Sequence, residues 1–318
     1  MRRTPLLVIP TALLLAGCAA AAPASTPTAE GPLTLSNCGV EVTFDAAPQR
    51  VVTIKSTSTE MLLALGLGDR IVGTAFQDGP VPDEWAADAA GLPVLADKMP
   101  SEEVVLAAEP DLVYSGWESA FSPDAAGDRD ELEALGVASY VQPAACQSAE
   151  QPGKLDFDEI FREIAEVADI FDVSADELLA AQQEELDAIE PLAGDLTAFW
   201  WSSGTDTPYV GAGIGAPQLI LETAGLTNIA GDIDMTWSPY GWESVLAADP
   251  DVLVLVDADW NTAQKKIDYL KSNPATANLT AVINERFVIL PFASTEAGVR
   301  SVSAATSLVA QLEELDLS

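Results

Sequence analysis

Lys55 occupies a position where α/β proteins commonly bind ligands. It follows the β-branched run Arg50 to Ile54 and precedes an apolar helix, with Thr57 and Glu60 in the spacing of a capping box. Ligands of open α/β sheets bind at the carboxyl ends of strands, and helix N-termini favour anions. We expect Lys55, together with Ser56 and Thr57, to bind an anionic part of a ligand. The alternative is that Lys55 is a solvated lysine.

Aromatic side chains form the second group that could contact a ligand. Seven tryptophans occur, and several follow predicted strands. Trp200 and Trp201 are neighbours in a strand-like segment. Because side chains alternate along a strand, only one of the two can face a ligand-binding cleft, and we favour Trp201. Aromatic faces bind a flat conjugated molecule by stacking, although a tryptophan can equally fill a core. The tryptophans expected at the cleft are Trp117, Trp201, Trp237 and Trp260.

The absence of histidine removes several kinds of chemistry. No Ser-His-Asp or Cys-His relay can form, and no imidazole can bind zinc, manganese or haem. We therefore expect no catalysis, no cofactor and no metal site. A carboxylate-dependent glycosidase is the alternative from another class, because the 50 Asp and Glu residues could supply a catalytic pair. A third class is an adhesin or structural lipoprotein. A closed or featureless cleft would favour this class.

A repeated phrase indicates which elements position these residues. Glu103 to Val113 reads EVVLAAEPDLV, and Glu243 to Leu253 reads ESVLAADPDVL. Each copy predicts a short helix ended by a proline, then a tight turn and an apolar strand. A second pair of similar phrases, Leu65 to Asp69 and Ala224 to Asn228, precedes the two copies in the same order. The chain is therefore predicted to be an α/β protein of two related lobes.

One helix between the two copies is predicted to join the lobes. Ser174 and Glu177 have the spacing of a capping box, and the helix is expected to run to about Ile189, before Pro191. A surface helix of one lobe is the alternative. The predicted organisation is an N-terminal lobe over 34–172, a linking helix over 173–190 and a C-terminal lobe over 191–318.

The N-terminal segment is typical of an exported lipoprotein. Arg2 and Arg3 precede an apolar run, Leu6 to Leu15, that is too short to span a bilayer. The letters LAGC, ending at Cys18, resemble the bacterial lipobox, in which the signal is cut before a cysteine that carries the lipid. We expect a signal peptide over 1–18, a flexible tether over 19–33, and an extracytoplasmic protein anchored through Cys18. A plain signal cut elsewhere is the alternative.

Two cysteines remain once Cys18 is lipidated. Cys38 and Cys146 form an even pair in an oxidising compartment, so we expect a disulfide between them, with two buried thiols as the alternative.

The formal net charge of −36 would repel nucleic acid and anionic lipid headgroups. We therefore expect no nucleic-acid partner and membrane contact through the N-terminal lipid only. We also expect a monomer.

The opening of the mature chain resembles a known family. The segments Pro48 to Ile54 and Thr59 to Gly73 are similar to the start of the periplasmic binding proteins that serve ABC importers for cobalamin and iron-siderophore complexes. The resemblance implies two Rossmann-like lobes joined by one long helix, with the ligand in the cleft between them. It also implies that Glu103 and Glu243 dock onto arginines of the membrane subunits. Without the resemblance, each glutamate would be interpreted as complementing a helix dipole.

Three further segments resemble one subgroup of that family. Thr53 to Glu60, Ser115 to Ser119 and Asp206 to Pro217 are similar to the subgroup proposed to import the phosphorylated deazaflavin precursor of coenzyme F-420. That ligand has a planar ring and anionic groups. The resemblance implies that Tyr209 and Arg300 contact the ligand together with Lys55 and the tryptophans. An iron-siderophore or cobalamin is the alternative ligand.

Overall fold

The computed structural model describes residues 31–147, 153–192 and 194–317. The predicted signal peptide, the lipidation site Cys18 and most of the predicted tether lie outside these residues. Within the described residues, no helix is long and apolar enough to cross a membrane.

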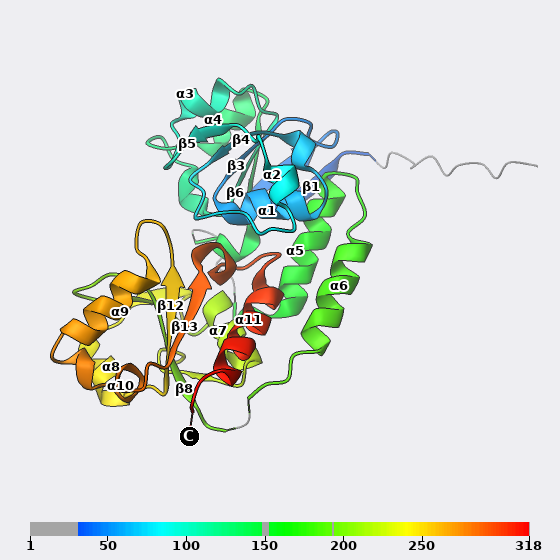
Figure 1. Cartoon of the computed structure of the whole chain (residues 1–318). Coiled ribbons are helices and arrows are strands. Elements are labelled where there is room, and N and C mark those ends of the chain that lie inside the picture. The colour runs from blue at the N-terminus through cyan, green and yellow to red at the C-terminus, as the bar shows by residue number, and fades with distance from the viewer. Residues whose placement is uncertain (1–30, 148–152, 193, 318) are drawn as a thin grey trace, which may run out of the picture. The chain divides into compact units, whose positions relative to one another are not determined.

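The first lobe is built on a parallel sheet of five strands (Figure 1). In sheet order these are β5 (Val94–Ala96), β4 (Ile71–Ala75), β3 (Val51–Ile54), β6 (Leu112–Ser115) and β7 (Ala138–Val141). The hairpin β1 (Leu33–Asn37) and β2 (Val40–Phe44) precedes it. The helices of this lobe are α1 (Ser56–Ala64), α2 (Ala86–Ala89), α3 (Glu102–Leu106) and α4 (Arg129–Ala134). The central strands β3 and β6 are fully buried, as expected for a parallel sheet covered on both faces.

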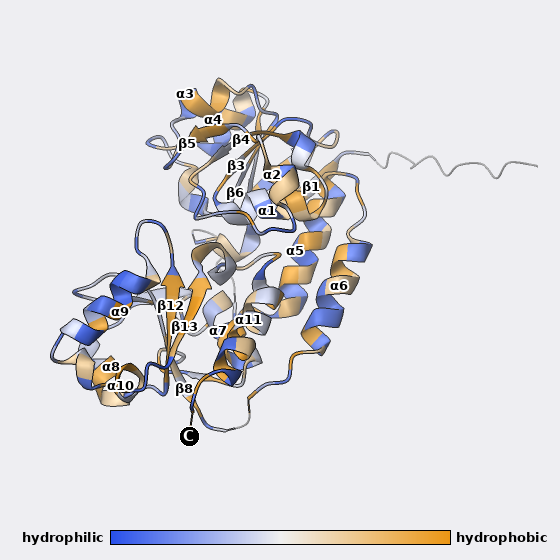
Figure 2. Ribbon diagram, in the orientation of Figure 1, coloured by the Kyte–Doolittle hydropathy of each residue, from blue (hydrophilic) through white to orange (hydrophobic). Residues whose placement is uncertain are grey.

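The second lobe is built on a mixed sheet. Its main order is β11 (Trp237–Pro239), β9 (Tyr209–Gly211), β8 (Thr197–Ser203), β12 (Val252–Asp257) and β13 (Phe287–Pro291), and β10 (Thr227–Asn228) pairs with β8. Strands β12 and β13, which are orange in Figure 2, lie parallel to each other. The helices are α7 (Ala216–Thr223), α8 (Trp242–Ala248), α9 (Ala263–Ser272), α10 (Thr280–Ile283) and α11 (Ser301–Glu313). The prediction of two α/β lobes is therefore confirmed.

Two helices, rather than one, lie between the lobes in the sequence: α5 (Phe157–Ile170) and α6 (Asp176–Asp187). On α5, Glu166 accepts a hydrogen bond from Tyr140 of the first sheet at 2.5 Å. On α6, Gln182 donates to the carbonyl of Val299 at 2.8 Å. Thus α5 packs on the first lobe and α6 on the second, and Figure 1 shows both extending from one to the other.

Both capping boxes predicted from the sequence are absent. Thr57 lies inside α1, whose N-cap is Lys55, and α6 begins after Ala175 with no side-chain cap. The hydroxyl of Ser174 accepts the N–H of Asp176 instead. A true capping box opens α5, where Asp156 and Glu159 each bond to the other's backbone N–H.

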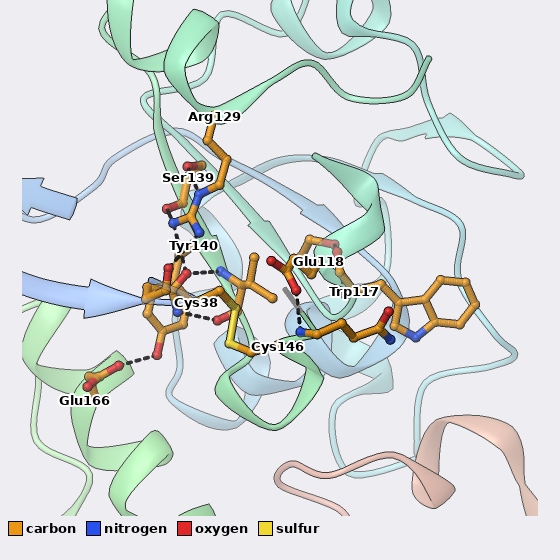
Figure 3. Close-up of a disulfide and its surroundings, with 12 residues drawn as sticks. Cys38, Trp117, Glu118, Arg129, Ser139, Tyr140, Cys146 and Glu166 are labelled. Atoms are coloured by element: carbon orange, nitrogen blue, oxygen red, sulfur yellow. Dashed lines mark hydrogen bonds between the residues drawn. A yellow bond between two sulfur atoms is a disulfide. The ribbon is translucent and has the colours of Figure 1, made fainter. Parts of the chain in front are cut away.

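Cys38 and Cys146 form a disulfide that ties the first hairpin to the segment after β7 (Figure 3). Asn37 reinforces the link, because its side-chain amide bonds to both the N–H and the carbonyl of Val141. Figure 3 shows Tyr140 and Glu166 on one side of the disulfide and Trp117 on the other. The disulfide therefore fixes the segment that continues from β7 toward the cavity described next.

Candidate ligand-binding site

A cavity of about 310 Å³ lies where loops of both lobes meet. The first lobe contributes residues that follow β6 and β7, and the second contributes residues at or after β8, β9, β11, β12 and β13. Most of these loops follow the carboxyl ends of strands, which is where open α/β sheets bind ligands. The lining includes Gly116, Trp117, Ser119, Gln142, Cys146, Ser202, Ser203, Tyr209, Gly215, Thr236, Trp237, Trp260, Phe292, Thr295 and Glu296.

Aromatic rings dominate this lining. Tyr209 and Trp237 lie on paired strands, diagonally across one face, and stack with centroids 6.4 Å apart and planes 13° apart. Trp260 meets Phe292 edge to face at 5.6 Å. Tyr209 and Trp260 are exposed, with 42% and 53% of their surfaces accessible. The structure thus places Trp117, Tyr209, Trp237 and Trp260 around one cavity with free ring surface for stacking.

Trp201 does not line the cavity, so its predicted orientation is wrong. Its indole N–H donates to the carbonyls of Ser203 and Gly204, and its ring packs edge to face on Trp242. Trp200 points to the opposite face and is equally buried. Strand alternation separates the two rings as expected, but both faces of β8 are covered, and neither ring reaches the cavity.

Lys55 is buried and paired within the protein. Its ammonium forms an ion pair with Asp78 and lies 3.8 Å from the centroid of the Trp117 ring. The rings of Phe76 and Phe292 lie 4.4 and 4.8 Å from the same nitrogen. Its backbone has a φ of 80°, in a region that side-chain-bearing residues seldom adopt. Lys55 therefore packs against the Trp117 ring and does not itself line the cavity.

The start of α1 was predicted to bind an anionic group of the ligand. It binds the side chain of Asp78 instead. The Asp78 carboxylate accepts the N–H of Ser56 at 3.3 Å, and the hydroxyl of Ser56 accepts the N–H of Asp78 at 2.8 Å. Thr57 is buried against Gly116, where an added Cβ would lie 2.2 Å from the threonine hydroxyl. The prediction that Lys55, Ser56 and Thr57 face the ligand is thus wrong: the anion at this site belongs to the chain.

Arg300 is the second predicted ligand contact that the structure moves away from the cavity. It pairs with Glu60 of α1 at 3.3 Å, and Glu60 is almost fully buried. Glu296, which we did not predict, lines the cavity and accepts the indole N–H of Trp117 at 2.5 Å. Its other carboxylate oxygen, Oε2, is buried and has no hydrogen-bond partner among the described residues. These contacts join α1 and the loop after β6 to the segment 296–300.

Lys55, Glu60, Asp78, Glu296 and Arg300 form what we call the buried charge cluster. Burial raises the pKa of Glu60 to about 7 against the opposing effect of Arg300, and burial raises the pKa of Glu296 to about 7 against that of Lys55. Burial also raises the pKa of Asp78. Three carboxyl groups share two cations, so the fully ionised cluster lacks one positive charge.

Glu103 and Glu243 lie apart from the cavity lining, on α3 and α8. Each is in the first turn of its helix, and each side chain is exposed. The hydroxyl of Ser101 caps α3 by accepting the N–H of Val104. The two glutamates therefore occupy equivalent, accessible positions on the two lobes.

Comparisons with known proteins agree with this architecture. The family model described as "periplasmic binding protein" matches residues 51–293. A periplasmic binding protein from Veillonella parvula has 28% identity and a TM-score of 0.77, covering 90% of this chain and 98% of that one. An ABC-type Fe³⁺-hydroxamate transport protein from Saccharomonospora viridis has 30% identity and a TM-score of 0.76, covering 88% and 98%.

More distant structures share the fold. A periplasmic heme-binding protein from Vibrio cholerae has 20% identity and a TM-score of 0.65, covering 83% of this chain and 98% of that one. No curated protein matches the sequence. The family match covers well over half of the chain and includes all of the described cavity lining except Thr295, Glu296 and Ala297. The chain belongs to the periplasmic binding protein family.

Proposed function

We propose that this protein is the lipid-anchored extracytoplasmic receptor of an ABC importer and that its cavity binds a conjugated organic ligand. The observation that carries the proposal is the ring of aromatic side chains, Trp117, Tyr209, Trp237 and Trp260, around one cavity. Among the described residues of the lining, Glu296 is the one carboxylic acid, so the carboxylate pair needed for glycoside cleavage is missing. A binding role is therefore favoured over an enzymatic one.

Two ligand classes are the main candidates for this site. The planar ring of the phosphorylated deazaflavin precursor of coenzyme F-420 matches the stacked pair Tyr209 and Trp237. An iron-siderophore is the second candidate, because the relative from Saccharomonospora viridis belongs to a Fe³⁺-hydroxamate transport system. Cobalamin, a third conjugated ligand, belongs in the same test.

Binding is tested by quenching of tryptophan fluorescence with the deazaflavin precursor, ferric siderophores and cobalamin. We expect saturable quenching by one class. Trp237→Ala should weaken that binding by about 1 to 3 kcal/mol, through lost stacking and burial. Trp85→Phe, outside the cavity lining, is the control and should leave affinity unchanged. If no ligand of the panel gives saturable quenching, the transport proposal is wrong.

The lipid anchor is proposed from the lipobox alone and has its own test. In cells of a lipoprotein-processing host, Cys18→Ser should move the protein from the membrane fraction to the soluble fraction, because no thiol remains to receive the lipid. Immunoblots of the two fractions measure the change, with Ala22→Ser in the tether as the control. Continued membrane association of the Cys18→Ser protein would show that something else anchors it.

A further inference from the structure

We infer that the cavity selects ligands that carry a positive charge, such as an ammonium group, and that the ligand supplies the cation that the buried charge cluster lacks. The inference rests on the proposed function and specifies the ligand's chemistry. It reverses the expectation drawn from Lys55 and Arg300 in the sequence.

The charged groups of the lining favour a cation. No lysine or arginine lines the cavity among the described residues, whereas Glu296 does. Lys55 is held by Asp78, and Arg300 by Glu60. An anion entering the cavity would therefore meet a carboxyl group and no free cation, in a site where screening by water is reduced.

The carboxyl group of Glu296 is only partly hydrogen-bonded. Trp117 satisfies one of its carboxylate oxygens, and the other is buried without a hydrogen-bond partner in the described part of the chain. A buried carboxylate with one unsatisfied oxygen is costly, and a nearby cation removes that cost. An ammonium group in the cavity would therefore be stabilised by Glu296.

The aromatic rings of the lining also favour cations. Ring faces attract ammonium groups through their quadrupoles. The same corner of the molecule already holds one ammonium in this way, because Lys55 lies against Phe76, Trp117 and Phe292. Trp117 and Phe292 also line the cavity, together with Trp260. The net charge of −36 further attracts cations toward the protein.

Two probes that differ in one positive charge test whether the cavity prefers a cation. One is a linear ferric trihydroxamate with a free terminal ammonium group, net charge about +1 at neutral pH, and the other is its N-acetylated derivative, which is neutral. We expect the first to bind about tenfold more tightly or better, the scale of a charge-assisted hydrogen bond. In Glu296→Gln the two affinities should come within about threefold. Glu313→Gln, an exposed residue of α11, makes the same change in net charge and should keep the preference.

A second measurement applies to any ligand that binds and does not depend on a variant. Glu60 and Glu296, which lie among Lys55, Asp78 and Arg300, each have a pKa of about 7 and are partly protonated at pH 7. A bound cation lowers these pKa values and releases protons, whereas a bound anion raises them and takes protons up. Calorimetric titration at pH 7 in two buffers of different ionisation enthalpy measures the sign, and we expect release.

The outcomes separate the two proposals. Preference for the acetylated probe, for a ferric tris-catecholate or for the deazaflavin precursor would overturn the charge inference and keep the transport function. So would proton uptake on binding, or a preference that survives in Glu296→Gln. Failure of every probe to bind would reject the proposed function, and the inference with it.

Discussion

Charge reversal at the two proposed docking residues, Glu103 and Glu243, should abolish uptake by cells while ligand affinity in solution stays within about twofold, because these exposed charges are screened from the cavity. Glu103 and Glu243 are exposed in the first turns of α3 and α8. In the family that the sequence resembles, glutamates at these positions contact arginines of the membrane subunits. Glu103→Arg with Glu243→Arg would therefore place arginine against arginine. Uptake of labelled ligand and quenching of the purified protein measure the two effects separately.

The control variant reverses the charge of two glutamates at other exposed positions. Glu131→Arg with Glu313→Arg reverses two exposed glutamates of α4 and α11 and should leave uptake near the unmodified level. If the control pair abolishes uptake as fully, net charge rather than docking is responsible. If the Glu103 and Glu243 pair loses affinity in solution as well, these residues shape the lobes and the docking proposal is wrong.

Removing the partner of a buried lysine should have the largest effect on stability. Asp78→Ala leaves the ammonium of Lys55 buried and without its carboxylate, and also removes the acceptor for the N–H of Ser56. Loss of one member of a buried ion pair costs about 3 to 5 kcal/mol of unfolding free energy. Urea denaturation followed by circular dichroism measures the change.

Two further variants make this prediction specific. Asp69→Ala breaks a surface pair with Arg70, in which Asp69 is 81% exposed, and should cost at most about 1 kcal/mol. Lys55→Met combined with Asp78→Leu removes both charges and should be more stable than Asp78→Ala alone, since no ammonium is left buried without its carboxylate. Equal destabilisation by Asp78→Ala and Asp69→Ala would show that the Lys55 pair contributes little.

The sequence predicted where the site lies better than it predicted what the site contains. Lys55 does stand at the carboxyl end of a strand beside a helix start, as local pattern indicated. Its partner could not be assigned, because Asp78 follows the neighbouring strand and only the pairing of β3 with β4 brings the two together. We did not predict β4, so no signal in the sequence pointed to Asp78.

Other errors have equally definite causes. Trp201 was placed at the cleft because alternation leaves one of two adjacent rings for each face, but helices cover both faces of β8. The resemblance implies that Arg300 contacts the ligand, and local pattern could not reveal its partner, Glu60, because the two are 240 residues apart in sequence. The start of the helix at Ser174 was nearly correct, whereas the capping geometry depends on backbone angles that the residue types do not determine.

The segment from Phe292 to Arg300 makes the cavity depend on residues that are far apart in the sequence. The strands of the first sheet lie within residues 51–141, and the disulfide joins Cys38 to Cys146. Trp117 and Lys55 of this lobe contact Glu296 and Phe292, and 179 residues separate Trp117 from Glu296. The first lobe therefore cannot form the wall around Trp117 by itself. A chain that stopped before β13 would lack Phe292 and Glu296, and with them part of the cavity lining.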